Sequence, residues 1–165
     1  AHTNAPEAYS ALIREWATDD YRGRGGWDLY GGVGAFVPSM SEALGGGRIE
    51  SVDYSSAATS RRQQVADACD VRVHHGDAAA VVGELERPPG LVVLDPPRAG
   101  AGAEVVRAIA LAAPERIIHV GCDPAAFARD LAGFGEHGYA VKQMKLIDAF
   151  PNTHHFEVIA MLEAV

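Results

Sequence analysis

Short apolar runs alternate with amphipathic segments along almost the whole chain, and this alternation leaves few folds open. The apolar runs have the length and branched composition of buried strands. The segments between them carry apolar residues every three to four positions, as packed helices do. We predict strands at residues 26–30, 48–53, 71–75, 91–95, 116–121, 139–147 and 156–162. We predict helices at residues 7–17, 35–44, 56–68, 78–85, 103–112 and 124–134.

The connections between these elements predict the topology. Strands joined through single helices by short loops become parallel neighbours, with helices on both faces of one sheet. The last two strands have no helix between them, and residues 148–153 contain the Asp, Pro and Asn typical of a turn between antiparallel strands. We therefore predict a doubly wound, Rossmann-like α/β sheet of seven strands, mostly parallel, with a terminal antiparallel hairpin. The length suits one domain, which we place at residues 1–165.

The composition excludes several classes of protein. Apolar residues make up 48% of the chain, yet no apolar run reaches the roughly 18–20 residues that cross a bilayer. Residues 1–6 do not resemble a signal peptide, and two cysteines are too few for a disulfide framework. We expect a cytoplasmic, monomeric protein with reduced thiols. The net charge of −8 argues against strong nucleic-acid binding by this chain alone, because phosphate neutralisation supplies much of that affinity.

Polar and reactive residues recur where the predicted strands end. The run 28–34 follows the first strand, and Asp53, Asp77, Asp95 and Cys122 end or follow the next four. The carboxyl ends of parallel strands share one edge of the sheet, and ligands of such folds bind beyond that edge. These residues therefore predict one binding site.

The loop at residues 28–34 is rich in glycine, including Gly32 and Gly34, and glycine lets the backbone turn sharply and approach a ligand. Asp53, at the end of the next strand, can accept hydrogen bonds from both hydroxyls of a ribose. A dinucleotide would need a further glycine where this chain has Val37, which disfavours a dehydrogenase. A tight structural turn without a ligand is the alternative.

The acidic residues at this edge favour a cationic cofactor. Asp28 precedes the glycines, where a carboxylate repels pyrophosphate but can hold an ammonium group. S-adenosylmethionine (SAM) carries an ammonium and a sulfonium, and it suits an acidic rim. That predicted rim consists of Asp28, Asp53, Asp77 and Asp95. Asp77 has two equally good interpretations, a contact with adenine or the N-cap of the following helix.

Two further loops carry residues for chemistry. Residues 95–98, Asp-Pro-Pro-Arg, lack the aromatic residue expected of an amine methyltransferase, so Arg98 either orients a carbonyl or phosphate oxygen or lies in solvent. Cys122 precedes a helix that Asp123 can cap, and the positive end of that helix favours a thiolate. We predict that Cys122 is a nucleophile, whereas Cys69, inside a helical pattern, is structural.

Glu157 begins the last predicted strand, among apolar residues. A carboxylate is costly to bury there without a purpose, and the position suits a general base. An exposed position at the start of the strand is the alternative. The histidine pairs at 74–75 and 154–155 point to opposite faces of a strand and lack an obvious third ligand, so we predict no metal site.

Four segments resemble, in order, the motifs of the SAM-dependent RNA 5-methyluridine methyltransferases, and the likeness runs over residues 1–165. They are Asp-Leu-Tyr-Gly-Gly-Val-Gly at 28–34, Asp-Pro-Pro-Arg at 95–98, Gly-Cys-Asp-Pro-Ala-Ala-Phe-Ala-Arg-Asp at 121–130 and Phe-Pro-Asn-Thr-His-His-Phe-Glu at 150–157. The resemblance implies a class I SAM-dependent methyltransferase fold and methyl transfer to a uridine of tRNA or rRNA. It also implies that this catalytic domain follows an N-terminal RNA-binding domain, absent here, which would supply basic surface.

The residues and the resemblance together predict a role for each position. Contacts to SAM are predicted for Tyr30, Gly32, Gly34, Ala35, Asp53, Asp77 and Asp95. Cys122 is the predicted nucleophile and Glu157 the base, with Asp95 also in the catalytic group and Arg98 binding substrate. The chain departs from the family at Ala35, where asparagine is a common cofactor contact. It departs again at 121–124, where Ser-Cys-Asn-Pro is common instead of Gly-Cys-Asp-Pro.

The expected chemistry follows from the target atom. C5 of uracil is a poor nucleophile until a thiolate adds at C6, and a base must later remove the C5 proton so that the thiolate can leave. Two alternatives stay open beside the disfavoured dehydrogenase. One is a methyltransferase of a small molecule or protein in which Cys122 is structural, and the other is a non-catalytic RNA-binding module.

Overall fold

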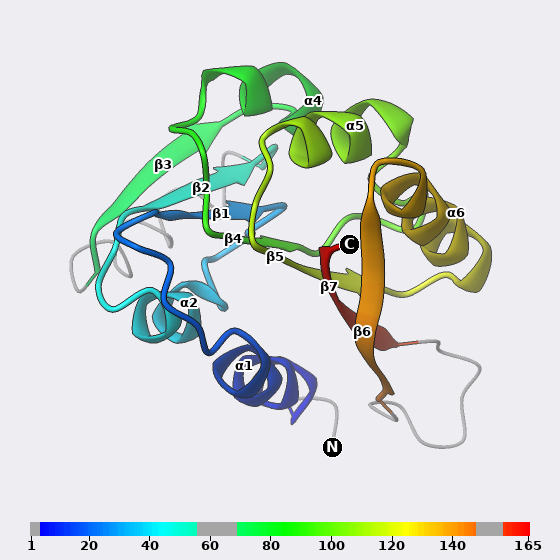
Figure 1. Cartoon of the computed structure of the whole chain (residues 1–165), viewed down its shortest axis with the longest axis horizontal. Helices are drawn as coiled ribbons and strands as arrows, with labels where there is room; N and C mark the ends of the chain where they lie inside the picture. The colour runs from blue at the N-terminus through cyan, green and yellow to red at the C-terminus, as the bar shows by residue number, and fades with distance from the viewer. Residues whose placement is uncertain (1–3, 56–68, 148–156) are drawn as a thin grey trace.

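A computed structural model describes residues 4–55, 69–147 and 157–165, and its centre is a seven-stranded sheet. The strands are β1 (Gly26–Leu29), β2 (Ile49–Asp53), β3 (Val71–His75), β4 (Leu91–Leu94), β5 (Arg116–Gly121), β6 (Tyr139–Leu146) and β7 (Val158–Ala164). They lie in the order β3-β2-β1-β4-β5-β7-β6 (Figure 1). β1 to β5 pair in parallel, whereas β7 runs antiparallel between β5 and β6. The predicted topology, including the terminal hairpin, is confirmed.

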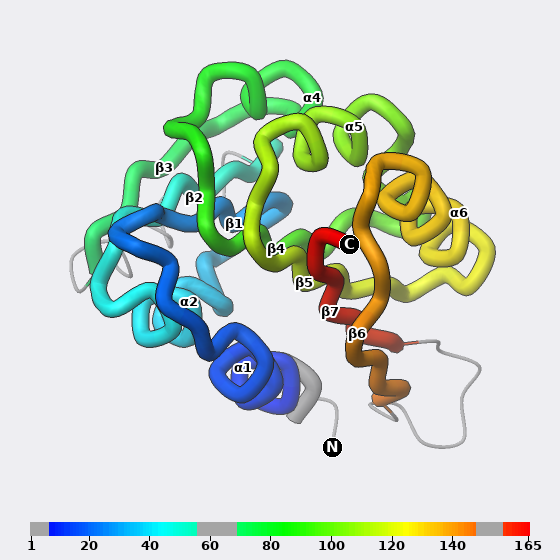
Figure 2. The backbone as a smooth tube through the Cα atoms, in the orientation of Figure 1, coloured from blue at the N-terminus to red at the C-terminus, as the bar shows by residue number. Residues whose placement is uncertain are grey.

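Helices cover both faces of this sheet. They are α1 (Asn4–Trp16), α2 (Val37–Ala43), α4 (Ala78–Val81), α5 (Ala103–Leu111) and α6 (Pro124–Glu136), with a 3-10 turn η1 (Val82–Glu84) after α4. α1 and α2 pack on one face, and α4, α5 and α6 pack on the other (Figure 2). The helix predicted at 56–68 lies outside the described residues. Among the residues that are described, no helix is both long and apolar enough to span a membrane.

The side chains of β4 show how one strand serves two cores. Val92 and Leu94 pack in the core beneath α4, α5 and α6, whereas Leu91 and Val93 pack in the core beneath α1 and α2. All of these side chains are fully buried, as in a parallel sheet covered on both faces. Burying a Val or Leu side chain stabilises a fold by ~1.5–3 kcal/mol. The unbroken apolar run that predicts this strand therefore reflects two buried faces.

Two helices differ from the prediction. α2 begins later than expected, because the preceding loop turns through residues with positive φ, namely Tyr30 (60°), Gly32 (56°) and Gly34 (83°). The helix predicted at 78–85 is the short α4 followed by the 3-10 turn η1, which contains Gly83. Glycine is a poor residue for the interior of an α-helix, and 3-10 turns are common at helix ends.

The strand order reverses between β1 and β4, because the chain builds outward from β1 on one side and from β4 on the other. Loops that leave two such strands diverge, and a crevice opens between them at the carboxyl ends of the strands. The amide of Asp95, just after β4, donates to the carbonyl of Leu29 at 3.3 Å, which keeps the two strand ends together beneath that crevice. The crevice lies where the sequence predicts the ligand.

Candidate active site

The loop after β1 turns sharply because its residues occupy unusual backbone conformations. Tyr30 has a positive φ, which a residue other than glycine adopts at a cost of order 1 kcal/mol or more. At Gly31 a Cβ atom would lie 2.2 Å from Oδ2 of Asp28 and 2.9 Å from Oγ of Ser51, so a side chain does not fit without displacement. The Gly31 amide donates to the carbonyl of Val52 at 2.9 Å. The loop therefore brings its backbone close to the end of β2.

Two backbone donors orient the carboxylate of Asp53. The amide of Gly32 donates to Oδ2 at 2.8 Å, and the amide of Ser55 donates to Oδ1 at 2.7 Å. A carboxylate offers about four acceptor positions, so Asp53 keeps capacity for two hydroxyl groups. This arrangement suits recognition of a ribose diol.

A cavity of about 550 Å³ opens at the crevice, within the range of about 300–1,000 Å³ typical of small-molecule sites. It is lined by Tyr30, Val52, Asp53, Tyr54, Gly76, Asp77, Ala78, Asp95, Pro96 and Pro97. The lining includes carboxylates and, among the described residues, no Lys or Arg. The structure thus brings together Tyr30, Asp53, Asp77 and Asp95, as predicted.

The other predicted cofactor residues do not line this cavity. Gly32 and Gly34 belong to the turn beside it, and Gly32 contributes by orienting Asp53. Ala35 is exposed and lines a separate hollow of about 430 Å³ together with residues of α1. Contact between Ala35 and a cofactor therefore stays a prediction.

Two acidic residues of the predicted rim have structural roles. Asp77 is the N-cap of α4, where its side chain accepts from the amide of Ala79 at 3.4 Å, and it also lines the cavity. Its geometry therefore agrees with both interpretations. Asp28 is 1% exposed and accepts a hydrogen bond from the Ser51 hydroxyl at 2.9 Å. The placement of Asp28 on an exposed rim is wrong, because β1 directs this side chain toward β2 inside the fold.

β5 and β7 bring Cys122 and Glu157 side by side. Gly121 and Val158 are directly opposed at the end of this antiparallel ladder, and Cys122 and Glu157 flank that pair. Both residues are half-buried. Cys122 leads into α6, whose N-cap Asp123 accepts from the helix backbone at 3.0 Å, as predicted. Glu157 lies just before the observed start of β7 rather than inside the strand.

Asp95 lies within the same electrostatic cluster. Burial, and then the negative charges of Glu157 and Asp28, raise the pKa of Asp95 from 3.8 to about 7. By its accessible surface Asp95 is exposed at the open cavity that it lines, so the neighbouring atoms reduce its hydration without closing it off from water. A carboxyl that titrates near neutral pH in a cavity is a frequent mark of a functional site.

The same carboxylates act on the sulfur. Burial raises the pKa of the Cys122 thiol, and the charges of Glu157 and Asp95 raise it further, whereas Arg98 lowers it. The sequence predicts the opposite direction from the helix dipole alone. That prediction is wrong, because the fold places two carboxylates beside the sulfur that helix reasoning does not include.

Arg98 projects from the loop after β4 with its side chain 85% exposed. Its guanidinium lies 3.9 Å from the carboxylate of Asp123, the residue that follows Cys122. This exposure leaves both interpretations of Arg98 open, a solvated side chain or a group that meets an oxygen of the substrate.

Tyr9, which the sequence does not single out, contacts the predicted base. Its hydroxyl donates from α1 to Oε2 of Glu157 at 2.5 Å, between residues that are 148 positions apart. The ring is buried and packs edge-on against Phe36. A tyrosine on the apolar face of a helix is typical of a core residue, so no local pattern predicts this contact.

A buried histidine–aspartate pair supports the loops after β4 and β5. The sequence does not predict this pair. His119 of β5 and Asp130 of α6 lie 2.9 Å apart, both with side chains 1% exposed. Asp130 also accepts from the amides of Ala101 at 2.8 Å and Gly102 at 3.2 Å, just beyond residues 95–98. Burial alone would raise the pKa of Asp130, but these hydrogen bonds lower it below its usual value. Asp130 thus joins the loop after β4 to β5, the strand that precedes Cys122.

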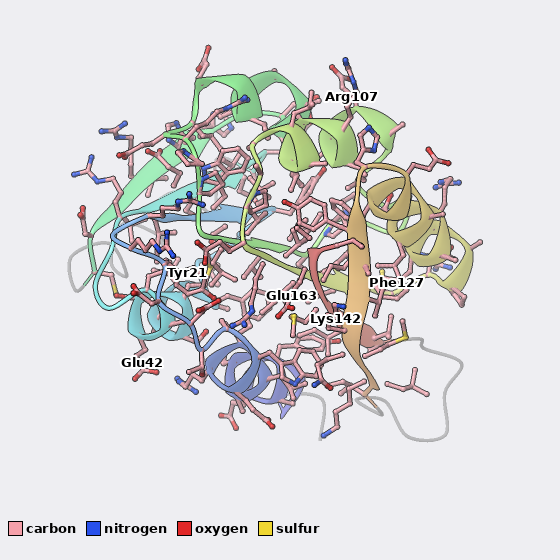
Figure 3. All side chains as sticks on the ribbon, in the orientation of Figure 1. Tyr21, Glu42, Arg107, Phe127, Lys142 and Glu163 are labelled. Carbon is pink, nitrogen blue, oxygen red and sulfur yellow. The ribbon has the colours of Figure 1, made fainter. Side chains whose placement is uncertain are left out.

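The departure from the family at Gly121 has a local explanation. A Cβ atom at Gly121 would lie 2.3 Å from the ring of Phe127. Phe127, labelled in Figure 3, comes from the start of α6, and its ring packs edge-on against His119 with centroids 5.1 Å apart. Serine at position 121 therefore does not fit beside phenylalanine at position 127 without displacement.

The remaining candidate ligands do not converge. His74 contacts the buried carboxylate of Glu50, whereas Nε2 of His75 faces the carbonyl of Tyr54 at 2.9 Å. The histidines at 154–155 lie outside the described residues. Within residues 4–55, 69–147 and 157–165, no group of three or more His, Cys, Asp and Glu side chains is arranged to hold a metal ion. Cys69 is half-buried against the core beneath α1 and α2.

Sequence comparisons lead to RNA methyltransferases. The sequence model of the tRNA (uracil-5-)-methyltransferase family matches residues 89–165. An uncharacterized RNA methyltransferase of Corynebacterium efficiens is 44% identical over 167 residues, which cover 98% of this chain and 39% of that protein. The chain therefore spans well under half the length of this relative.

Structural comparisons agree. The tRNA (uracil-54, C5)-methyltransferase of Pyrococcus abyssi, in complex with S-adenosyl-L-homocysteine, superposes with a TM-score of 0.74 at 25% identity, covering 92% of this chain and 37% of that one. Precorrin-6y C5,15-methyltransferase of Geobacter metallireducens has a TM-score of 0.75 at 15% identity, covering 94% of this chain and 87% of that one, and bears on the fold alone. The predicted Rossmann-like fold of class I SAM-dependent methyltransferases is confirmed.

Proposed function

From its confirmed resemblance to the RNA (uracil-5-)-methyltransferases, we propose that the protein transfers a methyl group from SAM to C5 of a uridine in tRNA or rRNA. Cys122 is the nucleophile and Glu157 is the base. The observation that carries this proposal is the juxtaposition of these two side chains at adjacent ends of β5 and β7, beside Asp95 and the acidic cavity. C5 methylation of uracil requires a thiol and a base that reach the same pyrimidine ring.

The cavity suits SAM in volume and in charge. SAM supplies a methyl group bonded to a positively charged sulfur. Asp53 would hold the ribose hydroxyls, and Asp77 would lie beside the adenine. Asp95 would attract the cationic part, since opposite charges in a sheltered site favour each other's ionised forms. With SAM bound, the same positive charge would favour the Cys122 thiolate and oppose the effect of Glu157 and Asp95, which raise its pKa.

The reaction begins when the Cys122 thiol releases its proton to water and the thiolate sulfur bonds to C6 of the uracil. The electron pair of the C5–C6 bond then makes C5 a nucleophile, which takes the methyl group and leaves S-adenosylhomocysteine. Glu157 removes the proton from C5, the C5–C6 double bond forms again, and the bond between C6 and the sulfur breaks. Arg98, exposed at the rim, is the candidate to hold a carbonyl or phosphate oxygen of the RNA.

RNA must present the uridine outside its stack, because the thiol and the base lie at the edge of the sheet. The net charge of −8 gives this chain little electrostatic attraction for RNA. We therefore also propose that residues 1–165 are the catalytic domain and that an N-terminal RNA-binding domain supplies most of the affinity. The greater length of the C. efficiens relative leaves room for such a domain.

A covalent trap tests the nucleophile. RNA containing 5-fluorouridine is incubated with the intact protein and SAM, and a fluorine atom at C5 cannot be removed as a proton, so the adduct persists on a denaturing gel. Cys122→Ala should abolish both the adduct and the methylation of ordinary RNA. Cys69→Ala, the matched control, should retain both. Methylation that survives in Cys122→Ala would contradict the mechanism and favour a methyltransferase with another class of substrate.

A second variant tests the base. Glu157→Gln should methylate C5 but release the RNA slowly, so the methylated covalent adduct accumulates on ordinary RNA. Glu42→Gln, an exchange of an exposed glutamate on α2 that is labelled in Figure 3, should turn over normally. A Glu157→Gln enzyme with unchanged turnover would exclude this carboxylate as the base.

A further inference from the structure

The hydroxyl of Tyr9 reaches the base from the opposite end of the chain. It donates to Oε2 of Glu157 at 2.5 Å, from a ring that is 5% exposed. The ring is held by Phe36, edge-on with centroids 6.1 Å apart and planes at 80°. Because the ring is buried and packed against Phe36, its hydroxyl is directed at the carboxylate of Glu157.

We propose that Tyr9 is a positioning residue for the base, which orients the Glu157 carboxylate toward C5. This inference rests on the proposed function and deepens it. Among the described residues, no other side chain donates to the Glu157 carboxylate. Tyr9 takes one acceptor position of Oε2, and we assign the proton transfer from C5 to Oε1.

The direction of this hydrogen bond is determined by the surroundings of the phenol. Burial raises the pKa of Tyr9, and its hydrogen bond with Glu157 and the negative charges of Glu157, Asp95 and Cys122 raise it further. The hydroxyl therefore stays protonated at any pH at which the enzyme works. Tyr9 serves as a donor and not as a second base, which leaves Glu157 as the acceptor.

The base needs a donor because its other charged neighbours are unfavourable to a carboxylate. Asp95 lies beside Glu157 from the loop after β4, and Cys122 lies beside it from the end of β5. Both become negative when they ionise. Arg98 and Asp123 also act on Cys122, and their charges are opposite. Tyr9, from α1, adds the hydrogen bond that holds this carboxylate in place.

Tyr9→Phe tests the inference, because it removes the hydroxyl and keeps the ring against Phe36. Tyr139→Phe is the matched control, since the Tyr139 hydroxyl is also buried but donates to the carbonyl of Pro114 at the opposite edge of the sheet. Both variants are assayed as intact enzymes with SAM and RNA isolated from cells that lack the gene. Adduct lifetime, kcat, KM and the pH–rate profile are measured.

Tyr9→Phe should lower kcat about tenfold or more with little change in KM, and methylated covalent adduct should accumulate. Tyr139→Phe should show neither effect. In a Glu157→Gln background, Tyr9→Phe should change nothing further, because the carboxylate on which it acts is gone.

A wild-type kcat and normal adduct lifetime in Tyr9→Phe would overturn this inference and leave the proposed function intact. If Tyr9→Phe fails to fold, 3-fluorotyrosine at position 9 keeps the ring and provides a more acidic donor, which should change the adduct lifetime. An unchanged adduct lifetime in that protein would overturn the inference equally. Failure of the Cys122 adduct in the wild-type enzyme would overturn the proposed function itself, together with this inference.

Discussion

Asp130→Asn should destabilise the protein strongly, because Asp130 is a buried hub rather than a surface carboxylate. It is 2% exposed and accepts three hydrogen bonds, from His119 at 2.9 Å, Ala101 at 2.8 Å and Gly102 at 3.2 Å. Asparagine keeps the shape of the side chain but removes its charge. One carboxylate oxygen becomes an NH2 group, which faces an N–H donor and cannot accept its hydrogen bond. The loop after β4 therefore loses its tie to α6.

The expected loss follows from the burial of the pair. Removing the carboxylate from a buried, hydrogen-bonded pair costs about 3–5 kcal/mol, because its donors stay buried without compensation. For a chain of 165 residues, each kcal/mol lowers Tm by about 2–4 °C, so Asp130→Asn should lower Tm by roughly 6–20 °C. The lowered pKa of Asp130 means that its ionised form stabilises the fold. The difference from wild type should be full at neutral pH and shrink only below the ordinary titration range of Asp.

Thermal unfolding followed by the fluorescence of the buried Trp27 measures this loss. Asp70→Asn is the control, since Asp70 pairs with Arg48 at 3.2 Å with 52% of its side chain exposed, and such pairs contribute below about 1 kcal/mol. If Asp130→Asn unfolds within 2 °C of Asp70→Asn, the buried pair does not support the fold as argued (about 2 °C being the least shift expected per kcal/mol).

Three further outcomes follow from the site. The raised pKa of Asp95 means that the folded state holds this proton more tightly than the unfolded chain does. The stability of the protein should therefore fall as pH rises from about 4 to about 7. In urea titrations, Asp95→Asn should remove that decline. Asp53→Asn should weaken SAM binding about 10–100-fold in calorimetry, because a charged acceptor of the ribose hydroxyls is lost. Gly121→Ser should lower stability by about 1–3 kcal/mol through overlap with the Phe127 ring, and Phe127→Leu in the same chain should restore part of it, whereas purely additive losses would argue against that overlap.

The fold and the polar edge of the sheet are predictable because each depends on local pattern. Buried strands, helix faces and glycine turns leave short-range signals, and the shared edge of parallel strands then brings distant residues together. Cys122 and Glu157 meet because β7 pairs with β5. The missing crossover helix predicts the antiparallel pairing of β6 with β7, but not the place of β7 beside β5.

The errors arise where side chains meet without a local pattern. The position of Tyr9 on the apolar face of a helix predicts a core residue, and its contact with Glu157 depends on how α1 packs on the sheet. Asp28 is predicted on the acidic rim although the predicted strand at 26–30 includes it, and β1 buries its carboxylate. The pKa of Cys122 is raised first by burial and then by two carboxylates that lie far away in the sequence, so reasoning from its own helix gives the wrong sign.

The central claim is that a methyl group is attached to C5 of uridine through Cys122. Nucleoside mass spectrometry of RNA from gene-deleted cells, treated with the intact protein and deuteromethyl-labelled SAM, tests it most directly. The account predicts labelled 5-methyluridine with the wild-type protein and none with Cys122→Ala. Label on another atom of the nucleoside, or labelled 5-methyluridine made by Cys122→Ala, would contradict it.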